Sequence, residues 1–242
     1  MDIVAQLKQT NLSGGVFTSL LVMLIMIILA VIIGIQAHFH DPLKKPKGLL
    51  LLAEVGVTFF ENFVEGMLGK RFRIFGGYLL AIGVYVFLAF IFGLTGLPSP
   101  MTSYAVPLSL GLSTFILIHA TAIKYNRLKY FKRYIEPMPL FLPINLISMW
   151  APLLSLSLRL FGNALSGFVI MSIIYYALQN LSGMIFASLE TMMGAWNQVF
   201  IAPFLAWILH LYFDLFSGFI QTTVFISLTA IYVGQEAPED YL

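Results

Sequence analysis

The stretch LLSLSLRLFGNALSGFV, residues 153–169, places one arginine, Arg159, in the middle of a long apolar run. An arginine at the centre of a membrane helix costs at least ~2.5–3.5 kcal/mol on insertion scales, so it requires an ionic partner or a water-filled cavity. Asn163 lies one helical turn after the arginine and Ser155 one turn before it, which predicts a polar stripe of low side-chain bulk. A structural ion pair inside a helix bundle is one interpretation. The surrounding region contains only one acid, Glu136, at its edge. We therefore favour the other interpretation, that the polar stripe is a helix face that a passing group approaches closely.

The composition is typical of an integral membrane protein, since 60% of the residues are hydrophobic and 10% are charged. There is no room for a soluble domain of any size. The chain contains no cysteine, which excludes disulfides and thiolate metal sites. It also lacks a glycine-rich phosphate loop ending in Lys-Ser/Thr, and a basic nucleic-acid patch outside its short loops. We therefore expect no nucleotide, nucleic acid, cofactor or metal to bind this chain.

Hydrophobic runs of membrane-spanning length predict an all-α protein. About 20 apolar residues cross the ~30 Å hydrocarbon core, and three runs of this kind are expected as spans: 16–37, 74–94 and 106–123. A cleaved signal peptide is the alternative for the first run, but its apolar core would be unusually long and no basic leader precedes it. Residues 49–68 carry acids on one helical face and apolar residues on the other, which predicts an amphipathic helix at the interface or against a partner helix.

The distribution of basic residues predicts the orientation of the chain in the membrane. All thirteen lysines and arginines except Lys8 and Arg159 lie in two loops, 44–73 and 124–133. The positive-inside rule puts both loops in the cytoplasm. The N-terminus and the 95–105 turn then lie outside and the C-terminus lies inside. The chain is thus expected to be a multi-pass protein of the cell membrane with an odd number of crossings.

The last two apolar segments, 140–178 and 195–234, are too long for simple spans. Each would be about 40 residues or ~60 Å long as a helix, twice what a ~30 Å core requires. Either each segment is two short spans, or each is one steeply tilted helix. Neither has a polar turn in its middle, and single crossings satisfy the odd count. We therefore predict about five crossings, the last two being long, tilted helices that form a hairpin.

A second polar stripe lies in the last apolar segment. His210, Asp214, Ser217 and Gln221 are spaced four, three and four residues apart, which puts them on one helical face. An ionisable residue at membrane depth is a functional hypothesis by default. The structural alternatives are that Asp214 forms an internal salt bridge with Arg159 or caps a local kink. A stripe that alternates acid, hydroxyl and amide is better explained as a wetted proton path.

The residues SLRLFGN at 157–163, followed by a small-residue pair, closely resemble the signature of subunit a of bacterial F-type ATP synthases, the stator of an ion-translocating motor. Further matches cover nearly the whole chain: KPKG at 45–48, GLP at 96–98, FILIHA and IKY within 115–125, P-x-N at 143–145, and Gln221 followed by SLTAIYVG. The resemblance implies two long tilted helices that form a hairpin curving along a rotor.

The resemblance also implies a mechanism. Arg159 matches the family's essential arginine, which faces the ring of c subunits, attracts each passing ring carboxylate and blocks direct leakage between two laterally offset proton half-channels. Asn163 would support this face, Gln221 matches a position facing the arginine helix, and Asp214 falls where relatives have a His or an acid in the external half-channel. The chain itself would be non-catalytic, coupling proton flow to ATP synthesis or hydrolysis. Its implied partners are the c-subunit ring, the b-subunit peripheral stalk, the lipid bilayer and the rest of the complex.

Three features depart from the family pattern. Phe168 stands where relatives usually have an acid or a His, Ser148 and Met149 stand where Gram-positive relatives often have two glutamates, and SYAVP at 103–107 lacks the usual polar asparagine and threonine. Phe168 cannot carry protons. We therefore expect Asp214 to serve alone, or together with His210 and with Glu190 near the external mouth. The predicted proton path as a whole comprises Asp214, Gln221, Asn163, Ser217, His210 and Glu190.

Two other functions fit parts of the pattern. An ion-coupled secondary transporter also uses intramembrane Arg and Asp, but it usually has internal repeats and more spans. A haem-bearing subunit needs facing histidines at similar depth, and only His119 and His210 are candidates; His119 is better explained as a packing residue. After the first span, His38, His40 and Asp41 indicate an interfacial polar cluster rather than a metal site, because no further ligand follows nearby.

Overall fold

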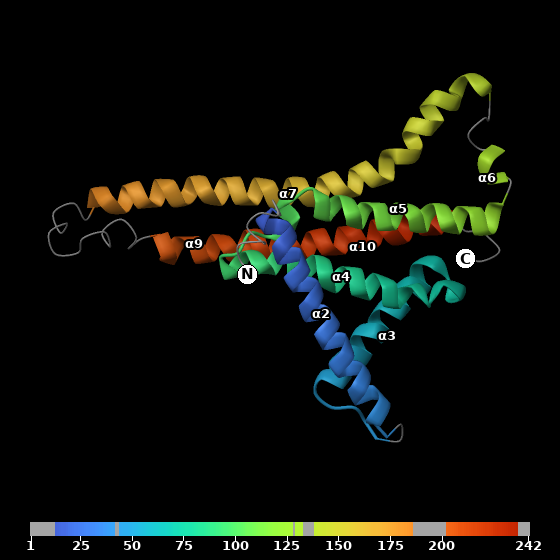
Figure 1. Cartoon of the computed structure of the whole chain (residues 1–242), viewed down its shortest axis with the longest axis horizontal. Helices are drawn as coiled ribbons and strands as arrows, with labels where there is room; N and C mark the ends of the chain where they lie inside the picture. The colour runs from blue at the N-terminus through green and yellow to red at the C-terminus, as the bar shows by residue number, and fades with distance from the viewer. Residues whose placement is uncertain (1–12, 42–43, 128, 133–137, 186–201, 237–242) are drawn as a thin grey trace, which may run out of the picture.

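The computed structural model describes residues 13–41, 44–127, 129–132, 138–185 and 202–236, and every regular element within them is helical (Figure 1). The α-helices are α2 (Gly14–Phe39), α3 (Leu49–Leu68), α4 (Phe75–Ile91), α5 (Ala105–Asn126), α6 (Lys129–Lys132), α7 (Leu142–Ile185), α9 (Ala202–His210) and α10 (Ser217–Gln235). Short 3-10 turns are Lys70–Phe72, Phe92–Thr95, Pro100–Thr102 and Pro139–Phe141, and a π-helical segment, Leu211–Phe216, joins α9 to α10.

Five helical stretches of the described chain are long and apolar enough to cross a membrane: Gly14–Phe39, Phe75–Thr95, Ala105–Asn126, Leu142–Ile185 and Leu205–Gln235. Because a helix rises ~1.5 Å per residue, even the 21-residue member of this set spans the ~30 Å hydrocarbon core. Large apolar side chains are exposed along α2, α7 and α9, as expected where lipid tails surround the helices. The chain is an all-α, multi-pass integral membrane protein, which confirms the predicted fold class.

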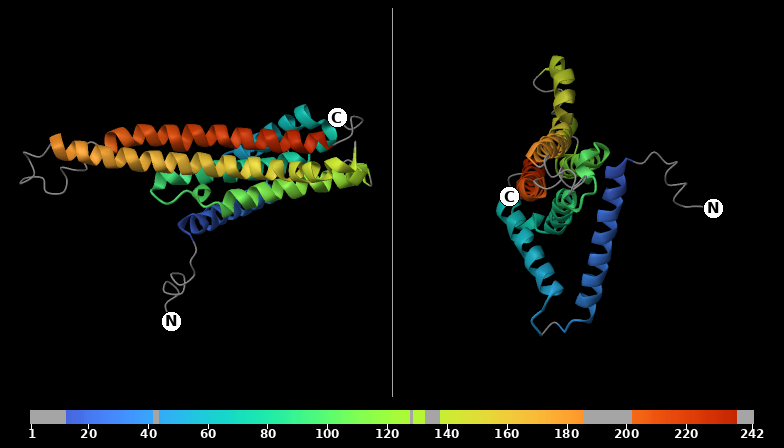
Figure 2. Two further views of the ribbon diagram at one scale, coloured as in Figure 1. Left: turned by 90° about the horizontal axis from the view of Figure 1, so that it is seen from above. Right: turned by 90° about the vertical axis from the view of Figure 1, so that its left-hand side faces the viewer.

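The helix α7 and the α9–α10 arm lie side by side, run in opposite directions and form a long hairpin (Figures 1 and 2). α4 and α5 pack along this hairpin, whereas α2 packs on α4 and runs at a steep angle to the hairpin, and α3 returns from the far end of α2 (Figures 1 and 2). The N-terminal part of α7 bends away from the bundle, and Pro152, which cannot donate a backbone hydrogen bond, lies in this part of the helix. The prediction of two tilted helices requires a hairpin that is inclined to a simple span such as α2, and the hairpin has this arrangement. The angle between the hairpin and the bilayer stays a prediction.

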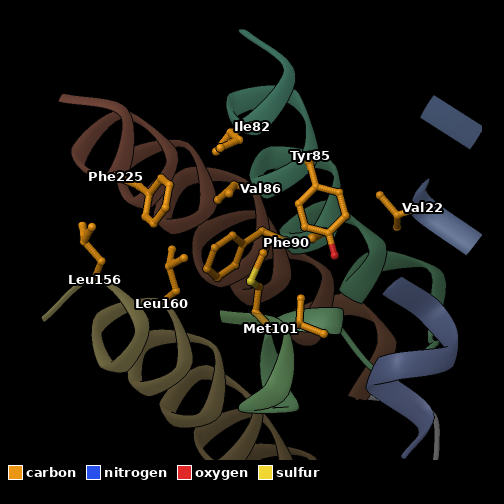
Figure 3. Close-up of a cluster of buried hydrophobic side chains, with 11 residues drawn as sticks. Val22, Ile82, Tyr85, Val86, Phe90, Met101, Leu156, Leu160 and Phe225 are labelled. Atoms are coloured by element: carbon orange, nitrogen blue, oxygen red, sulfur yellow. The ribbon is translucent and has the colours of Figure 1, made fainter. Parts of the chain in front are cut away.

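Interlocked side chains hold the hairpin against the shorter helices. Figure 3 shows Phe90 of α4 pointing toward α7 and α10, which contribute Leu156, Leu160 and Phe225 to the same buried cluster. Inside a bilayer lipid tails are as apolar as these side chains, so close van der Waals packing and interhelical hydrogen bonds keep the helices together. One such bond joins the buried hydroxyls of Ser19 on α2 and Tyr85 on α4, whose oxygens are 2.6 Å apart.

Two glycines allow α4 and α10 to approach closely, which positions the second polar stripe. A Cβ at Gly83 would lie 2.6 Å from Cδ1 of Ile226, and a Cβ at Gly218 would lie 2.7 Å from Cβ of Phe90. Small residues at helix crossings are the usual device for close approach in membranes. The contact at Gly218 lies directly after the π segment, so it anchors the part of the hairpin that carries the polar side chains.

Replacing Gly76 by alanine is expected to destabilise the junction of α3 and α4. A Cβ at Gly76 would lie 2.9 Å from both the backbone N and Cα of Glu61, which cannot move aside as a flexible side chain would. Arg73 also holds Glu61 there, with Nε 2.7 Å and Nη2 2.6 Å from Oε2. Overpacking of this kind costs about 1–3 kcal/mol, measurable as a lower unfolding temperature of the detergent-purified protein. Gly77→Ala is the control because nothing lies within 4 Å of its Cβ; equal unfolding temperatures for the two variants would contradict the prediction.

Candidate functional site

A cavity of about 440 Å³ lies between the two arms of the hairpin and the turn that follows α4. We call it the hairpin cavity. Its walls come from α7, from α9 and the π segment, and from the 93–102 turn. At ~30 Å³ per water molecule it has room for on the order of ten waters. Its polar lining residues are Ser99, Thr102, Asn163, Ser172, Tyr175, His210 and Asp214.

Three of these side chains form a continuous chain of contacts across the hairpin. Oη of Tyr175 on α7 lies 3.0 Å from Nε2 of His210, and Nδ1 of the same imidazole lies 2.6 Å from Oδ2 of Asp214. A neutral imidazole has one donor and one acceptor nitrogen. When Asp214 is ionised its oxygen can only accept, so Nδ1 donates to it and Nε2 accepts from the tyrosine hydroxyl. The side chains of His210 and Asp214 are 26% and 22% exposed, so both are held inside the hairpin while remaining open to the cavity.

The backbone around Asp214 departs from regular helix. The sequence predicts one helix over 195–234, whereas in the structure residues 211–216 form a π-helical segment between two α-helices. Such segments are rare and occur often at functional sites. Gly93 faces the carboxylate: a Cβ there would lie 3.1 Å from Oδ1 and 3.3 Å from Oδ2 of Asp214. The missing side chain at Gly93 therefore provides the space that the carboxylate occupies.

The polar path continues along the hairpin past Asp214. Nδ2 of Asn163 on α7 donates a hydrogen bond of 2.8 Å to Oγ of Ser217 on α10, which ties the two polar stripes together. One turn further along α10, Oε1 of Gln221 is buried and has no hydrogen-bond partner among the described residues. A buried amide oxygen without a partner is costly, so this oxygen is suited to accept a hydrogen bond from water or a visiting group.

Arg159 lies on the exposed side of α7. Its Nη2 is 3.4 Å from Oγ of Ser155, one turn back, and within the described parts of the chain no carboxylate forms an ion pair with it. Both structural alternatives raised by the sequence therefore lack support in these residues: Asp214 is paired with His210 rather than with Arg159, and its side chain contacts an imidazole rather than a backbone group. The guanidinium is available to a partner outside this chain.

Sequence reasoning missed Tyr175. Phe168 lines the hairpin cavity but its ring cannot exchange protons. Tyr175 follows seven residues later, and two turns of helix place it on the same face of α7. The seven-residue spacing could have indicated Tyr175 from the sequence, because a hydroxyl two turns after Phe168 on the same helix face can line the same cavity. Its contact partner could not be read from the sequence, since His210 is 35 residues away.

The other sequence-predicted residues fall outside the hairpin cavity or outside the described chain. Glu190 belongs to residues that the structure does not describe. Nδ1 of His119 lies 2.8 Å from the hydroxyl of Tyr130, and its ring packs edge-on against Phe115, so it behaves as the predicted packing residue. Within the described ranges, no three His, Asp or Glu side chains are grouped so as to hold a metal ion.

Replacing Gly93 by alanine is expected to lower the proton flux that the sequence predicts along the second polar stripe, without unfolding the chain. The added methyl group would lie 3.1–3.3 Å from the carboxylate atoms of Asp214, which must shift by a few tenths of an ångström. A shift of that size lengthens the 2.6 Å contact with His210 and weakens it. Proton flux in vesicles checks the prediction, with Gly77→Ala, which meets nothing within 4 Å, as the control. Parental flux in Gly93→Ala would show that the space beside the carboxylate is not critical.

Comparison with known proteins gives a consistent result. Residues 16–234 match the family described as ATP synthase A chain. ATP synthase subunit a of Mycoplasmoides gallisepticum is 30% identical over 239 residues, covering 88% of this chain and 77% of that protein. ATP synthase subunit a of Bacillus subtilis is 31% identical, covering 74% and 77% of the two chains. The sodium-ion-specific ATP synthase subunit a of Propionigenium modestum is 38% identical over 132 residues, covering 54% of this chain and 38% of that protein.

Proposed function

Because this chain belongs to the ATP synthase A chain family, and thus is part of an ATP synthase complex, we propose that it is the non-catalytic stator of the membrane sector. It guides protons past a rotating ring of c subunits and is held by a peripheral stalk of b subunits. The ring carries protons between two half-channels that are offset sideways and open to opposite sides of the membrane. Each elementary charge that crosses 100 mV releases ~2.3 kcal/mol, which the complex couples to ATP synthesis or consumes during ATP-driven pumping.

The exposed guanidinium of Arg159 is the observation that carries this proposal. Its hydrogen bond to Ser155 is long, at 3.4 Å, and no described carboxylate neutralises it. A cation at membrane depth needs compensation, which a carboxylate on each passing ring subunit supplies. The attraction favours the ionised form of that carboxylate, so the proton leaves there. The charge also repels protons that would otherwise cross directly between the half-channels.

The hairpin cavity fits the external half-channel. The 93–102 turn that forms one wall belongs to the side that the positive-inside rule puts outside, with the N-terminus, while the C-terminus is cytoplasmic. From that side inward, the polar groups follow in the order His210, Asp214, Ser217 with Asn163, and Gln221. Glu190 is proposed at the mouth of the same path. The order leads toward the level of Arg159 on the neighbouring helix.

Purification of the tagged chain from its native membrane tests the proposal. The stator should come out with a ring of small c subunits and with b subunits, and vesicles holding this complex should acidify when ATP is added. An ion-coupled secondary transporter would instead come out alone and drive solute exchange without ATP. Isolation without a ring, together with ATP-independent counterflow, would replace the stator proposal with the transporter.

A further inference from the structure

We propose that Tyr175 is the outer member of a three-residue relay, Tyr175–His210–Asp214, which passes protons from the hairpin cavity into the polar path of α10. This inference rests on the proposed function, because it assigns a role within the external half-channel. It adds Tyr175 as a proton-exchanging group on α7, where Phe168 cannot exchange protons. It also identifies the species transported on this side of the membrane as the proton rather than a hydrated cation.

The geometry of the three contacts suits a relay. Both nitrogens of the His210 ring are engaged, with Oη of Tyr175 3.0 Å from Nε2 and Oδ2 of Asp214 2.6 Å from Nδ1. These separations are hydrogen-bond distances. An imidazole held between a hydroxyl and a carboxylate can accept a proton on one ring nitrogen and release the proton bound to the other nitrogen. A histidine that only packs against its neighbours needs no such pair of partners.

The transfer is balanced at every atom. An excess proton carried by cavity water moves to Oη of Tyr175, leaving neutral water, as that hydroxyl gives its own proton to Nε2 of His210. The imidazole then releases its Nδ1 proton to Oδ2 of Asp214, which becomes neutral. No bond between heavy atoms forms or breaks, and no co-reactant is required. When the proton moves on toward Ser217, the carboxylate is restored, and transfer of the remaining ring proton back to Nδ1, through ring rotation or water, resets the histidine.

The position of Tyr175 in the hairpin suits a residue at the entrance of the path. On α7 the order from the external end inward is Tyr175, Phe168, Asn163 and Arg159, and sixteen residues separate the first from the last, or ~24 Å of helix. On the opposite arm the order inward begins with His210 and Asp214. Tyr175 and His210 therefore meet at the outer level of the cavity, where protons enter, and the phenylalanine lies deeper.

The chemistry of the three groups favours the proton over a metal cation. The three groups are in direct contact, so no ion fits between them. A hard cation such as Na⁺ is bound through several oxygen ligands, whereas the central member of this chain offers two ring nitrogens. Proton hopping needs only the hydrogen bonds that are already formed. The relay therefore predicts pumping that does not depend on sodium, although one relative is named as sodium ion specific.

The test is proton flux in vesicles that hold the whole ATP synthase complex, normalised to the amount of assembled ring. Tyr175→Phe keeps the aromatic ring, which lies 5.9 Å from the imidazole centroid, and removes only the hydroxyl. We expect about a tenfold loss of flux, equivalent to ~1.4 kcal/mol. Tyr176→Phe, the same change at a neighbouring side chain that is 70% exposed, is expected to pump at the parental rate. Parental flux in Tyr175→Phe, or an equal loss in both variants, would overturn the relay.

Two further variants separate proton transfer from packing. Tyr175→His restores a proton-exchanging group and should regain most of the flux; a loss as large as in the phenylalanine variant would make the residue structural. If Tyr175→Phe fails to assemble but Tyr175→His assembles, the flux of Tyr175→His tests the relay: flux near the parental rate supports it, and a large loss overturns it. His210→Gln keeps a hydrogen-bonding amide that cannot pass protons through. In one relay the double variant with Tyr175→Phe loses no more flux than His210→Gln alone, whereas losses that multiply would mean independent roles and would overturn the proposal.

Two controls distinguish failure of the relay from failure of the stator assignment. Pumping in a sodium-free choline buffer should equal that in sodium buffer, and a requirement for sodium would overturn the proton relay alone. Arg159→Ala is measured in parallel. If it stops pumping while Tyr175→Phe does not, the stator function stands and the relay falls. If neither variant changes pumping, both fall.

Discussion

Vesicles that carry Arg159→Ala are expected to show no ATP-driven proton pumping, although the complex still assembles. The guanidinium is exposed on α7 and has no ion-pair partner among the described residues, so the substitution removes no internal ion pair. At 4 Å the attraction between the arginine and a ring carboxylate is about 4 kcal/mol for an effective dielectric constant near 20, which corresponds to about a thousandfold in the equilibrium that releases the proton. Acidification of the vesicle lumen on addition of ATP measures the loss.

Ser166→Ala is the matched control for the arginine variant. Ser166 lies on the same face of α7, its hydroxyl donates a 3.0 Å hydrogen bond to the backbone oxygen of Asn163, and its side chain carries no charge. It should pump close to the parental rate. Unchanged pumping in Arg159→Ala would make the arginine a structural charge, and the functional interpretation would then have to rest on Asp214 alone.

Replacing Asp214 by asparagine is expected to reduce proton flux by about a hundredfold or more, the range found when a positioned proton-transfer group is removed. Asparagine has nearly the same shape, so it fits the space beside Gly93 and can still hydrogen-bond to His210. It cannot take up a proton. The effect should therefore appear in the rate of ATP-driven acidification and not in the yield of assembled complex.

Asp41→Asn makes the same chemical change outside the path. Asp41 follows α2, where its carboxylate lies 3.5 Å from Nζ of Lys44 and is 46% exposed. Its substitution should leave flux at the parental level, because exposed ion pairs contribute little. Full flux in Asp214→Asn would show that protons bypass this carboxylate, and it would remove Asp214 from the proposed half-channel.

Local properties of the sequence were sufficient to predict the fold class and the two polar stripes, but not Tyr175. The length and apolarity of the runs predict membrane helices because a bilayer tolerates only segments that satisfy their own backbone hydrogen bonds. The solitary Arg159 and the spacing of His210, Asp214, Ser217 and Gln221 predict two polar stripes because helical periodicity is a local property. The match to the ATP synthase A chain family confirms the family that the arginine motif indicated.

The tertiary structure decided which of these groups meet. The register of the hairpin brings Tyr175 to His210 across 35 residues and makes His210, not Arg159, the partner of Asp214. The π segment and the open space at Gly93 set the position of the carboxylate. Periodicity assigns a residue to a face of its own helix, but the partner of that face depends on how closely and at what register two helices pack. That packing is set by side chains and glycines far apart in the chain, so it became visible only in the folded molecule.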